Sequence, residues 1–290
     1  MILRTFDAAA EFLRRVGPTL LADEAENSLI LGVALRLRAG HSYGEEPAFL
    51  AYVEDCSEVL AAVVRTPPYN LLVREEREND DALGLVTAHL HGGGIRLPGI
   101  HGARSAALRF ANVWEETTRA RSEVAMEQCL YELTEVVAPS GVPGRVRLAD
   151  PDDRDLLVSW VRAFADEAVG GVLRQDPVGL VERLTEASTL AVWDDNGAAS
   201  MAAVSRATSN GISVSLVYTP PEKRGHGYAS ACVAGLSQRQ LDAGRRFCTL
   251  FADLANRTSN ALYQRIGYRP LADFVEIHFR YAKSEAAPMS

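Results

Sequence analysis

Residues 218–236, YTPPEKRGHGYASACVAGL, lead from an apolar segment through a charged turn into a run of small residues. The β-branched and aromatic residues before the turn favour a strand, and the small residues from Tyr228 onward favour a helix. Gly225 and Gly227 lack a Cβ, so the backbone can turn sharply and point several N–H groups outward. The unpaired N–H groups of the helix face the same place, and Arg224 adds a positive charge. The stretch therefore predicts a diphosphate site, with a plain tight turn as the alternative.

Two common phosphate-binding motifs do not fit this stretch. A P-loop requires a lysine after its last glycine, and no lysine follows the glycines here. The dinucleotide fingerprint requires a third glycine, but Ala229 and Ser230 follow Gly227, and the flanking sequence lacks a run of βαβ units. The predicted ligand therefore belongs to another class.

The turn instead resembles the signature loop of the GNAT acyl-CoA N-acyltransferase superfamily, whose pattern is Arg/Gln-x-x-Gly-x-Gly/Ala. Arg224, Gly227 and Ala229 fill that pattern. Downstream, DLANRTSNALYQRIGYRP (residues 253–270) resembles the superfamily's strand–helix segment that ends in Gly-Tyr or Gly-Phe. The resemblance covers residues 145–282. It implies an α/β fold with a mixed sheet (α+β), acetyl-CoA as co-substrate and no metal.

The resemblance also implies roles for individual residues. In the superfamily the strand before the loop, here Ser213–Thr219, separates from its neighbour at a bulge and exposes backbone groups to the pantetheine arm. A backbone N–H near Val217 or Tyr218 would stabilise the oxyanion, and Tyr263 would protonate the leaving thiolate. The residues assigned to the cofactor are Val217, Tyr218, Thr219, Arg224, Gly225, His226, Gly227, Tyr228, Ala229, Ser230, Asn256 and Asn260.

Several of these assignments have alternatives. Tyr263 could pack as an ordinary residue of an amphipathic helix, Asn260 could cap that helix, and His226 could be a solvated turn residue. The strand ISVSLVYT contains no carboxylate to deprotonate the amine. Asp253 and Glu276 are the nearest carboxylates in predicted strands, and a relay of ordered water is at least as good a candidate for the base.

The segment APSGVPG, residues 138–144, is the strongest break in the chain, because its prolines and glycines disfavour both helix and strand. It predicts an N-terminal α/β domain at residues 1–138, a linker at 139–144 and a GNAT-like domain at 145–290. After the linker the pattern predicts the order β-α-α-β-β-β-α-β-α-β.

The N-terminal half is predicted to contain similar elements in a similar order. Its clearest segments are a helix at 6–22, strands at 59–65 and 70–73, a helix at 103–116 and a strand at 124–136. GIHGARSAALRFA, residues 99–111, faintly resembles the C-terminal loop without completing its pattern. We therefore interpret this half as a smaller, degenerate GNAT-like repeat that shapes the acceptor pocket or stabilises the pair.

The composition, with 47% hydrophobic and 23% charged residues among 290, is that of a soluble globular protein. A formal net charge of −8 argues against a general nucleic-acid surface. No segment approaches the ~20 apolar residues of a membrane span, and the start of the chain lacks a signal core, so a cytoplasmic location is expected. The four cysteines are expected to be buried reduced thiols, and the scattered histidines predict no metal site.

These observations predict an N-acetyltransferase that moves an acetyl group from acetyl-CoA to an amine of a small molecule, or to a protein N-terminus, by direct attack in a ternary complex. A catalytically inactive CoA-binding regulatory or scaffold module is the alternative, because the strand lacks a carboxylate. The expected partner is a small-molecule amine, with no nucleic acid and no membrane, and a homodimer is left open. The acceptor itself is not encoded in a recognisable motif; its pocket would involve segments such as residues 163–172.

Overall fold

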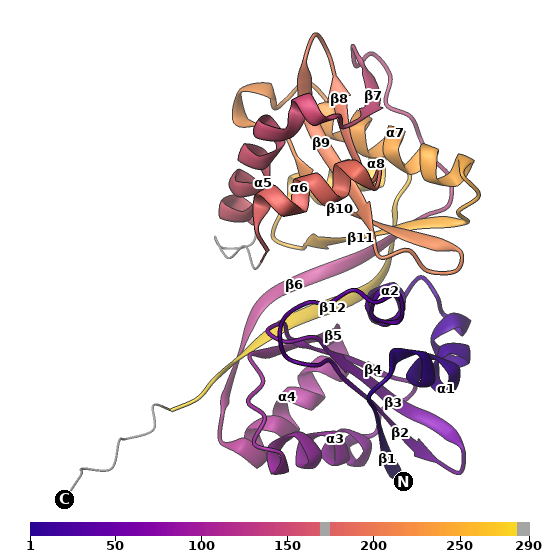
Figure 1. Ribbon diagram of the computed structural model, residues 1–290, viewed down its shortest axis with the longest axis vertical. Helices are drawn as coiled ribbons and strands as arrows, with labels where there is room; N and C mark the ends of the chain where they lie inside the picture. The colour runs from indigo at the N-terminus through magenta and orange to yellow at the C-terminus, as the bar shows by residue number, and fades with distance from the viewer. Residues whose placement is uncertain (169–174, 283–290) are drawn as a thin grey trace, which may run out of the picture. The chain divides into compact units, whose positions relative to one another are not determined.

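The structure of the protein is a computed structural model that describes residues 1–168 and 175–282 (Figure 1). The chain forms two compact units. The first unit consists of Met1–Cys129, Asp253–Ala255 and the residues from Ala272 onward, and the second consists of Leu130–Ala252 and Asn256–Leu271. The chain therefore passes between the units at residues 129/130, 252/253, 255/256 and 271/272, and the segment 139–144 lies within the second unit.

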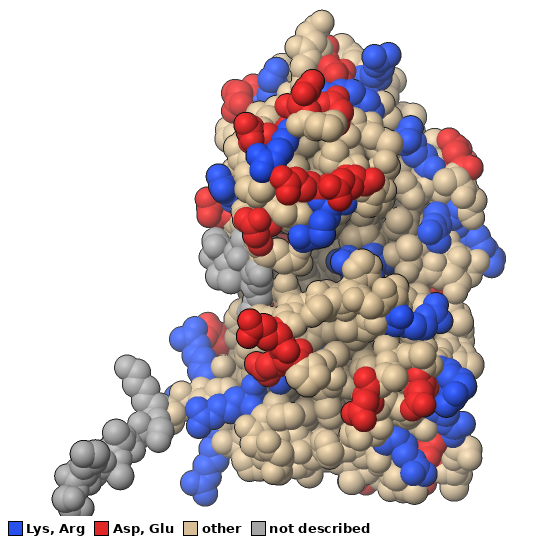
Figure 2. Space-filling view, viewed as in Figure 1, with Lys and Arg blue, Asp and Glu red and all other residues tan. Residues whose placement is uncertain are grey.

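The first unit contains most of the elements from the N-terminal half of the chain. They are β1 (Ile2–Phe6), α1 (Ala9–Ala22), α2 (Ser28–Arg38), β2 (Phe49–Asp55), β3 (Glu58–Arg65), β4 (Leu71–Glu75), α3 (Asp80–Gly92), β5 (Gly99–Ala103), α4 (Arg104–Thr118) and the start of β6 (Arg121–Leu133). Charged side chains of both signs are interspersed over the face drawn in Figure 2.

The second unit contains the elements that follow. They are β7 (Arg145–Leu148), the 3₁₀ turn η1 (Pro151–Asp153), α5 (Arg154–Ala168), α6 (Pro177–Glu186), β8 (Leu190–Asp194), β9 (Ala198–Ser205), β10 (Gly211–Tyr218), the 3₁₀ turn η2 (Pro221–Lys223), α7 (Tyr228–Asp242), β11 (Phe247–Asp253), α8 (Arg257–Arg265) and the start of β12 (Arg269–Arg280). This is the order predicted for residues after the linker.

The two halves of the chain repeat one order of elements and exchange their last strands. Leaving the 3₁₀ turns aside, β1 to β6 and β7 to β12 both follow β-α-α-β-β-β-α-β-α-β. The first unit has the strand order β1-β2-β3-β4-β5-β12, and the second has β7-β8-β9-β10-β11-β6. In the first unit Phe274–His278 of β12 pair antiparallel with Gly99–Ala103 of β5. Each sheet is therefore completed by a strand from the other half of the chain.

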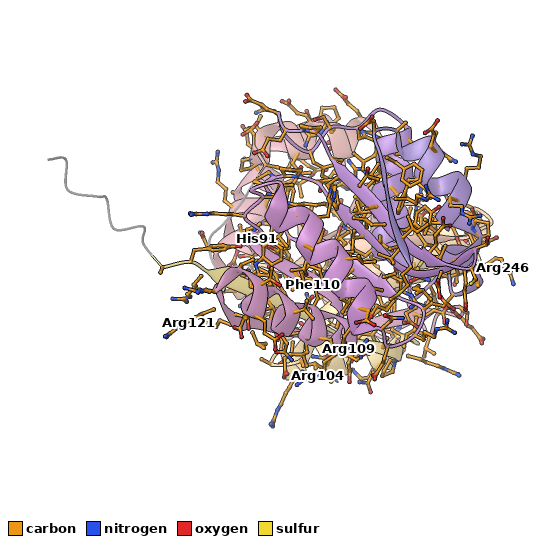
Figure 3. All side chains as sticks on the ribbon, turned by 90° about the horizontal axis from the view of Figure 1, so that it is seen from below. His91, Arg104, Arg109, Phe110, Arg121 and Arg246 are labelled. Carbon is orange, nitrogen blue, oxygen red and sulfur yellow. The ribbon has the colours of Figure 1, made fainter. Side chains whose placement is uncertain are left out.

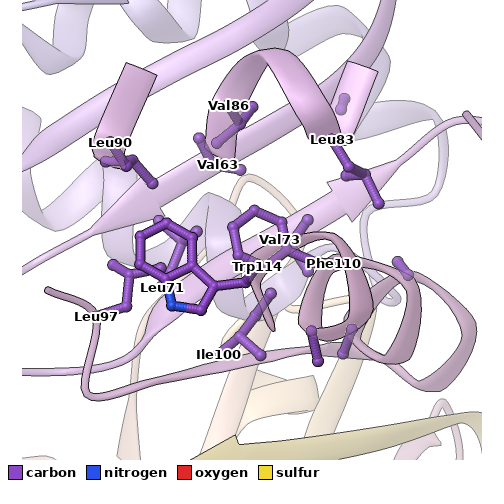
Figure 4. Packing of buried hydrophobic residues seen from close by; sticks show 14 of the residues in the cluster. Val63, Leu71, Val73, Leu83, Val86, Leu90, Leu97, Ile100, Phe110 and Trp114 are labelled. Carbon is purple, nitrogen blue, oxygen red and sulfur yellow. The ribbon is translucent and has the colours of Figure 1, made fainter. Parts of the chain in front are cut away.

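The sheet of the first unit is covered by helices on both faces, because its central strands are apolar on both. On β2, Leu50 and Tyr52 pack in one cluster with α1 and α2, while Ala51 and Val53 pack in another with α3 and α4. Trp114 of α4 lies at the centre of this second cluster (Figure 4). Three residues of β12 belong to it as well, namely Val275, Ile277 and Phe279.

In the second unit, α5 and α6 pack on one face of β8, β9 and β10 through a cluster that includes Leu157, Val192 and Tyr218. Helix α7 contacts β7 to β10. The segment predicted as a linker is held on this unit. Trp193 Nε1 donates a hydrogen bond to the carbonyl oxygen of Pro143 at 2.8 Å, and the Val137 N–H donates to the carbonyl oxygen of Ile266 at 3.0 Å.

Three details of the first unit differ from the expectation. Strands β1 and β5 were not predicted, and the predicted helix at 6–22 begins only at Ala9. Cys56 is exposed in the β2–β3 turn with a φ of 46°, so the prediction of a buried thiol there is wrong, whereas the other three cysteines are buried and all four are free.

Candidate functional site

Strand β10 departs from regular pairing on both of its sides. Against β9 the register is regular at Ser213–Ser215 and shifts before Tyr218, so β10 has one residue more than its partner there. Leu216 lies within this bulge and has a φ of 51°. Against β11 the parallel ladder consists of three residue pairs and ends at Ser213 and Thr249. The end of β10 therefore has the bulge and the separation from its neighbour that the resemblance implied.

The turn from β10 into α7 is open to solvent. Arg224–Gly227 are exposed, and Gly225 and Gly227 have φ values of 83° and 80°, in the left-handed region that favours glycine. Gly227 is the N-cap of α7, and it has no side chain that could accept a hydrogen bond from the first turn. The Ala231 N–H donates to the Gly227 carbonyl oxygen at 3.0 Å, so the N–H groups of residues 228–230 have no acceptor within the helix. The turn thus presents a group of free amides at a helix N-terminus.

Arg224 is held against the end of β10 by three groups. Its Nε donates to the carbonyl oxygen of Thr219 at 2.9 Å, its Nη2 lies 2.7 Å from Glu167 Oε2, and its Cζ lies 5.8 Å from the ring centroid of Tyr218. The buried Tyr218 ring lies 6.2 Å from that of Trp160, and its hydroxyl donates to Glu167 Oε1 at 3.4 Å. Burial and the nearby Glu167 raise the pKa of Tyr218. Glu167 therefore brings to this strand the carboxylate that the strand itself lacks.

The last residues of β10 are fixed to β9 through Ser200. The Thr219 hydroxyl donates to Ser200 Oγ at 2.8 Å, and Ser200 Oγ donates to the Tyr218 carbonyl oxygen at 3.0 Å. This pair of bonds holds the strand end in place immediately before the open turn. Val217, beside the bulge, is half-buried.

The two aromatic side chains of the turn are bonded within the protein. The Tyr228 hydroxyl donates to Asp195 Oδ2 at 2.6 Å, and this hydrogen bond raises the pKa of Tyr228. The exposed His226 ring stacks on the Tyr228 ring with centroids 5.5 Å apart. The Tyr228 hydroxyl is therefore occupied, whereas the His226 ring stays exposed to solvent.

Tyr263 lies on α8 between two other tyrosine rings. Its centroid is 6.3 Å from that of Tyr131 and 6.0 Å from that of Tyr268, and the residue is 8% exposed. Burial raises the pKa of Tyr263 to about 12, so the phenol is protonated at neutral pH. Among the described residues, none forms a hydrogen bond with its hydroxyl. The ring therefore packs as an ordinary helix residue would, and the proton remains available.

Asn256 and Asn260 both lie at the start of α8. Asn256 is the N-cap, because its Oδ1 accepts a hydrogen bond from the Ser259 N–H at 3.0 Å. Asn260 is therefore not the cap. Its Nδ2 donates to the Asn256 carbonyl oxygen at 2.7 Å, and its Oδ1 accepts from the Tyr131 hydroxyl at 2.7 Å. The Asn260 amide thus orders the start of the helix.

The two strand carboxylates considered as the base belong to the first unit. Glu276 Oε1 accepts a hydrogen bond from Asn70 Nδ2 at 2.8 Å and lies 2.9 Å from His278 Nε2. Asp253 Oδ1 accepts from the Ala255 N–H at 2.8 Å.

Three residues of this region were missed from the sequence, namely Glu167, Asp195 and Tyr131. Each is distant in the chain from the residue it contacts, and Tyr131 precedes the predicted linker, so no local pattern marks them. Residues 169–172 of the segment expected at the acceptor pocket lie outside the described residues.

The first unit has the corresponding junction, from β4 to α3, with the opposite charge. Its residues, Glu76–Asn79, contain no glycine. Asn79 caps α3 by accepting a hydrogen bond from the Ala82 N–H at 2.9 Å, and the buried Glu75 accepts one from the Asn79 N–H at 3.2 Å. Side-chain oxygens of the protein itself therefore bind one N–H group of the first turn of α3 and the N–H group of its N-cap residue.

Arg109 of α4 completes this acidic junction (Figure 3). It pairs with Glu75, with Glu78 at 2.8 Å and with Asp80 at 3.1 Å. Burial raises the pKa of Glu75, although Arg109 acts in the opposite direction. The guanidinium of Arg109 is thus paired with three of the protein's own carboxylates.

Strand β4, which corresponds to β10, also lacks the bulge. Strand β4 pairs with β3 in one regular register from Leu71 to Glu75. A cavity beside β4 and β5, lined in part by Leu72, Arg74 and His101, has a volume of about 20 Å³, enough for about one water molecule. The glycine-containing stretch Gly99–Ala111, predicted to resemble the C-terminal loop, is instead the β5–α4 junction. In element order it corresponds to β11–α8, so that prediction was placed one junction too late.

Among residues 1–168 and 175–282, no group of three or more potential His, Cys, Asp or Glu ligands is arranged to hold a metal ion. Within the same residues, no helix has the length and apolar character needed to cross a membrane.

Comparisons with known proteins agree with this geometry. Residues 179–275 match the family model described as FR47-like protein. A GCN5-related N-acetyltransferase from Sphaerobacter thermophilus aligns with a TM-score of 0.63 at 19% identity, covering 96% of this chain and 95% of that chain. A GNAT-family acetyltransferase from Colwellia psychrerythraea aligns with a TM-score of 0.59 at 12% identity, covering 97% of this chain and 100% of that chain.

A tandem GNAT protein from the clavulanic acid biosynthesis pathway aligns with a TM-score of 0.58 at 15% identity, covering 98% of this chain and 100% of that chain. A search of curated proteins found no match. The fold and the family match support an acyltransferase function. Residues 179–275, which include the open turn and the bulged β10, thus match the FR47-like family model, and the chain shares its fold with tandem GNAT proteins.

Proposed function

We propose that the second unit transfers an acetyl group from acetyl-CoA to an amine of a small molecule, or to a protein N-terminus, by direct attack in a ternary complex. The observation that carries the proposal is the open turn at Arg224–Ser230, where two glycines in the left-handed region leave a group of backbone N–H groups unpaired at the start of α7. Such a group of amides suits a diphosphate, which CoA carries.

The residues around this turn fit the rest of CoA. The separation of β10 from β11 beyond Ser213 leaves the backbone of the bulge without a parallel partner on that side, so an extended pantetheine arm can pair with it. Arg224 adds a half-exposed guanidinium next to the amides. A diphosphate there would compete with Glu167 for that guanidinium.

When bound, acetyl-CoA supplies an activated acetyl group on a thioester sulfur. The chain must then stabilise negative charge on the carbonyl oxygen and provide a proton for the sulfur. A backbone N–H at the bulge, near Val217 or Tyr218, is the candidate for the first. Tyr263 is the candidate for the second, because its phenol is protonated at neutral pH and its hydroxyl donates to none of the described residues.

The amine must lose a proton before it attacks. Strand β10 has no carboxylate, and Asp253 and Glu276 belong to the first unit. Glu167 provides a half-exposed carboxylate that accepts a hydrogen bond from Tyr218, whose ring packs against that of Trp160, and this combination of negative charge and aromatic rings suits a cationic amine. Glu167 and a relay of ordered water are the two candidates for the base.

The alternative is a CoA-binding module without turnover, which the missing strand carboxylate favours. Free-thiol release from acetyl-CoA, measured across a panel of amines, separates the two, with CoA affinity measured in parallel by calorimetry. For the enzyme we expect steady release with at least one amine, and a fall of about 10² or more in kcat for Tyr263→Phe. CoA binding without release for any amine would favour the module.

A matched control is Tyr52→Phe in the first unit. Tyr52 is also buried, and its hydroxyl accepts a hydrogen bond from Arg15 Nε at 3.0 Å and donates one to Glu54 Oε2 at 3.3 Å. This variant removes an equivalent buried hydroxyl outside the proposed site and should leave kcat unchanged. An equal loss in both variants would count against the proposed role of Tyr263.

A further inference from the structure

One face of helix α8 is bonded to a tyrosine from the N-terminal half of the chain. Tyr131, near the end of β6, is 2% exposed and belongs to the second unit. Its hydroxyl donates to Asn260 Oδ1 at 2.7 Å and accepts from Gln264 Nε2 at 3.3 Å. Asn260 and Gln264 are four residues apart and so lie on one face of the helix. A single hydroxyl thus ties two successive turns of α8 to the strand.

The same tyrosine also contacts the candidate acid. Tyr263 lies between Asn260 and Gln264 in sequence, and its ring packs against the Tyr131 ring on one side and the Tyr268 ring on the other. Tyr268 is itself fixed, because its hydroxyl lies 2.8 Å from Ser237 Oγ of α7. The rotation of α8 about its axis, and with it the direction of the Tyr263 phenol, therefore depends on the bonds made by Tyr131.

We propose that Tyr131 is a positioning residue for the acetyl transfer, setting the place of the Tyr263 hydroxyl through its bonds to Asn260 and Gln264. The proposal rests on the proposed function of Tyr263. It means that the reaction in the second unit depends on a residue that precedes both the predicted linker and the whole segment matched by the family model. Tyr131 does not touch the reacting atoms in this mechanism. It acts by holding the donor in place.

The experiment compares three variants of the full chain: Tyr131→Phe, Tyr263→Phe and the double variant. Tyr131→Phe keeps the ring and removes both hydrogen bonds. Because small displacements of a catalytic group are costly, we expect its kcat to fall by about tenfold or more while the KM for acetyl-CoA stays within about twofold. The double variant should be no slower than Tyr263→Phe alone, because the hydroxyl that Tyr131 positions is then absent. Tyr52→Phe is again the control.

A kcat for Tyr131→Phe within about twofold of the wild-type value would overturn the proposal. So would a double variant whose loss equals the product of the two single losses, since Tyr131 would then act independently of Tyr263. A wild-type chain without turnover, or an unchanged kcat in Tyr263→Phe, would instead defeat the proposed function, and this inference with it.

Gln264→Ala provides a second variant in case Tyr131→Phe does not fold. Gln264 is exposed, and its loss removes one of the two hydrogen bonds at the Tyr131 hydroxyl. We expect a smaller fall in kcat that disappears in the Tyr263→Phe background. A fall of the same size in both backgrounds would overturn the proposal.

Discussion

The two units follow one order of strands and helices, yet the junctions after β4 and β10 have opposite electrostatic character. After β10, two glycines leave the first amides of α7 open and Arg224 lies beside them. After β4, Asn79 binds the Ala82 N–H of the first turn of α3, Glu75 binds the N–H of Asn79 itself, and Arg109 pairs with acids. The bulge that opens β10 has no counterpart in β4.

The difference shows what a helix N-terminus does in each case. A helix that satisfies its first N–H groups with its own side chains is stabilised by them, because negative charge there is favourable. A helix that leaves those groups open gives up that stabilisation and retains a place for an anion. The first unit binds N–H groups at the start of α3 with its own side chains, and the second unit leaves those of α7 open. The shared order of elements alone therefore does not make a binding site.

The largest effect should come from separating the exchanged strands. A chain of residues 145–290 lacks β6, and a chain of residues 1–144 lacks β12. Each sheet would lose its last strand, and the first unit would lose Val275, Ile277 and Phe279 from its core. We expect neither fragment to give a dispersed NMR spectrum or thiol release, and a mixture of the two to recover both. A fragment 145–290 with the turnover of the full chain would contradict this.

The next effect should come from giving the second unit the acidic character of the first. In Ala229→Glu a carboxylate in the first turn of α7 would repel a diphosphate, and we expect the affinity for CoA to fall by about tenfold or more by calorimetry. The free energy of unfolding should rise by about 0.3–1 kcal/mol, because the acid favours the helix N-terminus.

The matched variant is Ala229→Gln, which has nearly the same volume and no charge. Ala229→Gln should lose much less affinity for CoA than Ala229→Glu, and its free energy of unfolding should rise less. Equal losses of CoA affinity in the two variants would mean that the larger side chain excludes the ligand by its size. The electrostatic explanation of the difference between the units would then be wrong.

The smallest expected effect is the pH dependence of stability, which should have opposite signs for a carboxyl group in each of the two units. Hydrogen bonds from Arg147, at 2.6 and 2.8 Å, lower the pKa of Asp153 in the second unit. A carboxyl with a lowered pKa stabilises the fold at pH values above its unfolded-state pKa, near 3.8. This stabilisation is lost as the pH falls through the folded-state pKa. Burial raises the pKa of Glu75 in the first unit, so its contribution is present below about 4.5 and is lost as the pH rises.

Thermal unfolding from pH 3 to 8 tests these signs. Asp153→Asn should unfold about 2–4 °C below wild type at neutral pH, with the difference vanishing at the acid end. The unfolding temperature of Glu75→Gln should rise relative to that of wild type as the pH rises. If the difference in unfolding temperature from wild type changed with pH in the same direction in both variants, the predicted contrast between the two units would be wrong.

The sequence could predict the parts of the fold that are local in the chain. The strand–turn–helix at residues 211–242 was predicted because β-branched residues, two glycines and a run of small residues follow one another. By contrast, β5 was missed because its two glycines suggested a turn. They are there because neighbouring strands approach closely: a Cβ at Gly99 would lie 2.2 Å from the Ile277 carbonyl oxygen, and one at Gly102 would lie 2.6 Å from Val73 Cγ1.

The exchange of β6 and β12 could not be predicted for a different reason. Both segments have ordinary strand patterns, and a strand pattern does not specify which neighbour a strand pairs with. The contacts of Tyr131 and Glu167 likewise join residues more than 50 positions apart. The roles assigned to Tyr263 and to the cofactor-binding residues stay predictions until the variants are measured.

The position of β12 in the first unit also determines when that unit can be finished during protein synthesis. Residues 1–129 leave the ribosome well before Val275, Ile277 and Phe279 are made, so the apolar surface around Trp114 stays uncovered while the second half of the chain is translated. Such long-range pairing makes completion of the sheet slow. The half that is synthesised first is therefore the one whose core is filled last, and the fluorescence of Trp114, 5.8 Å from the Phe279 ring, would report that moment.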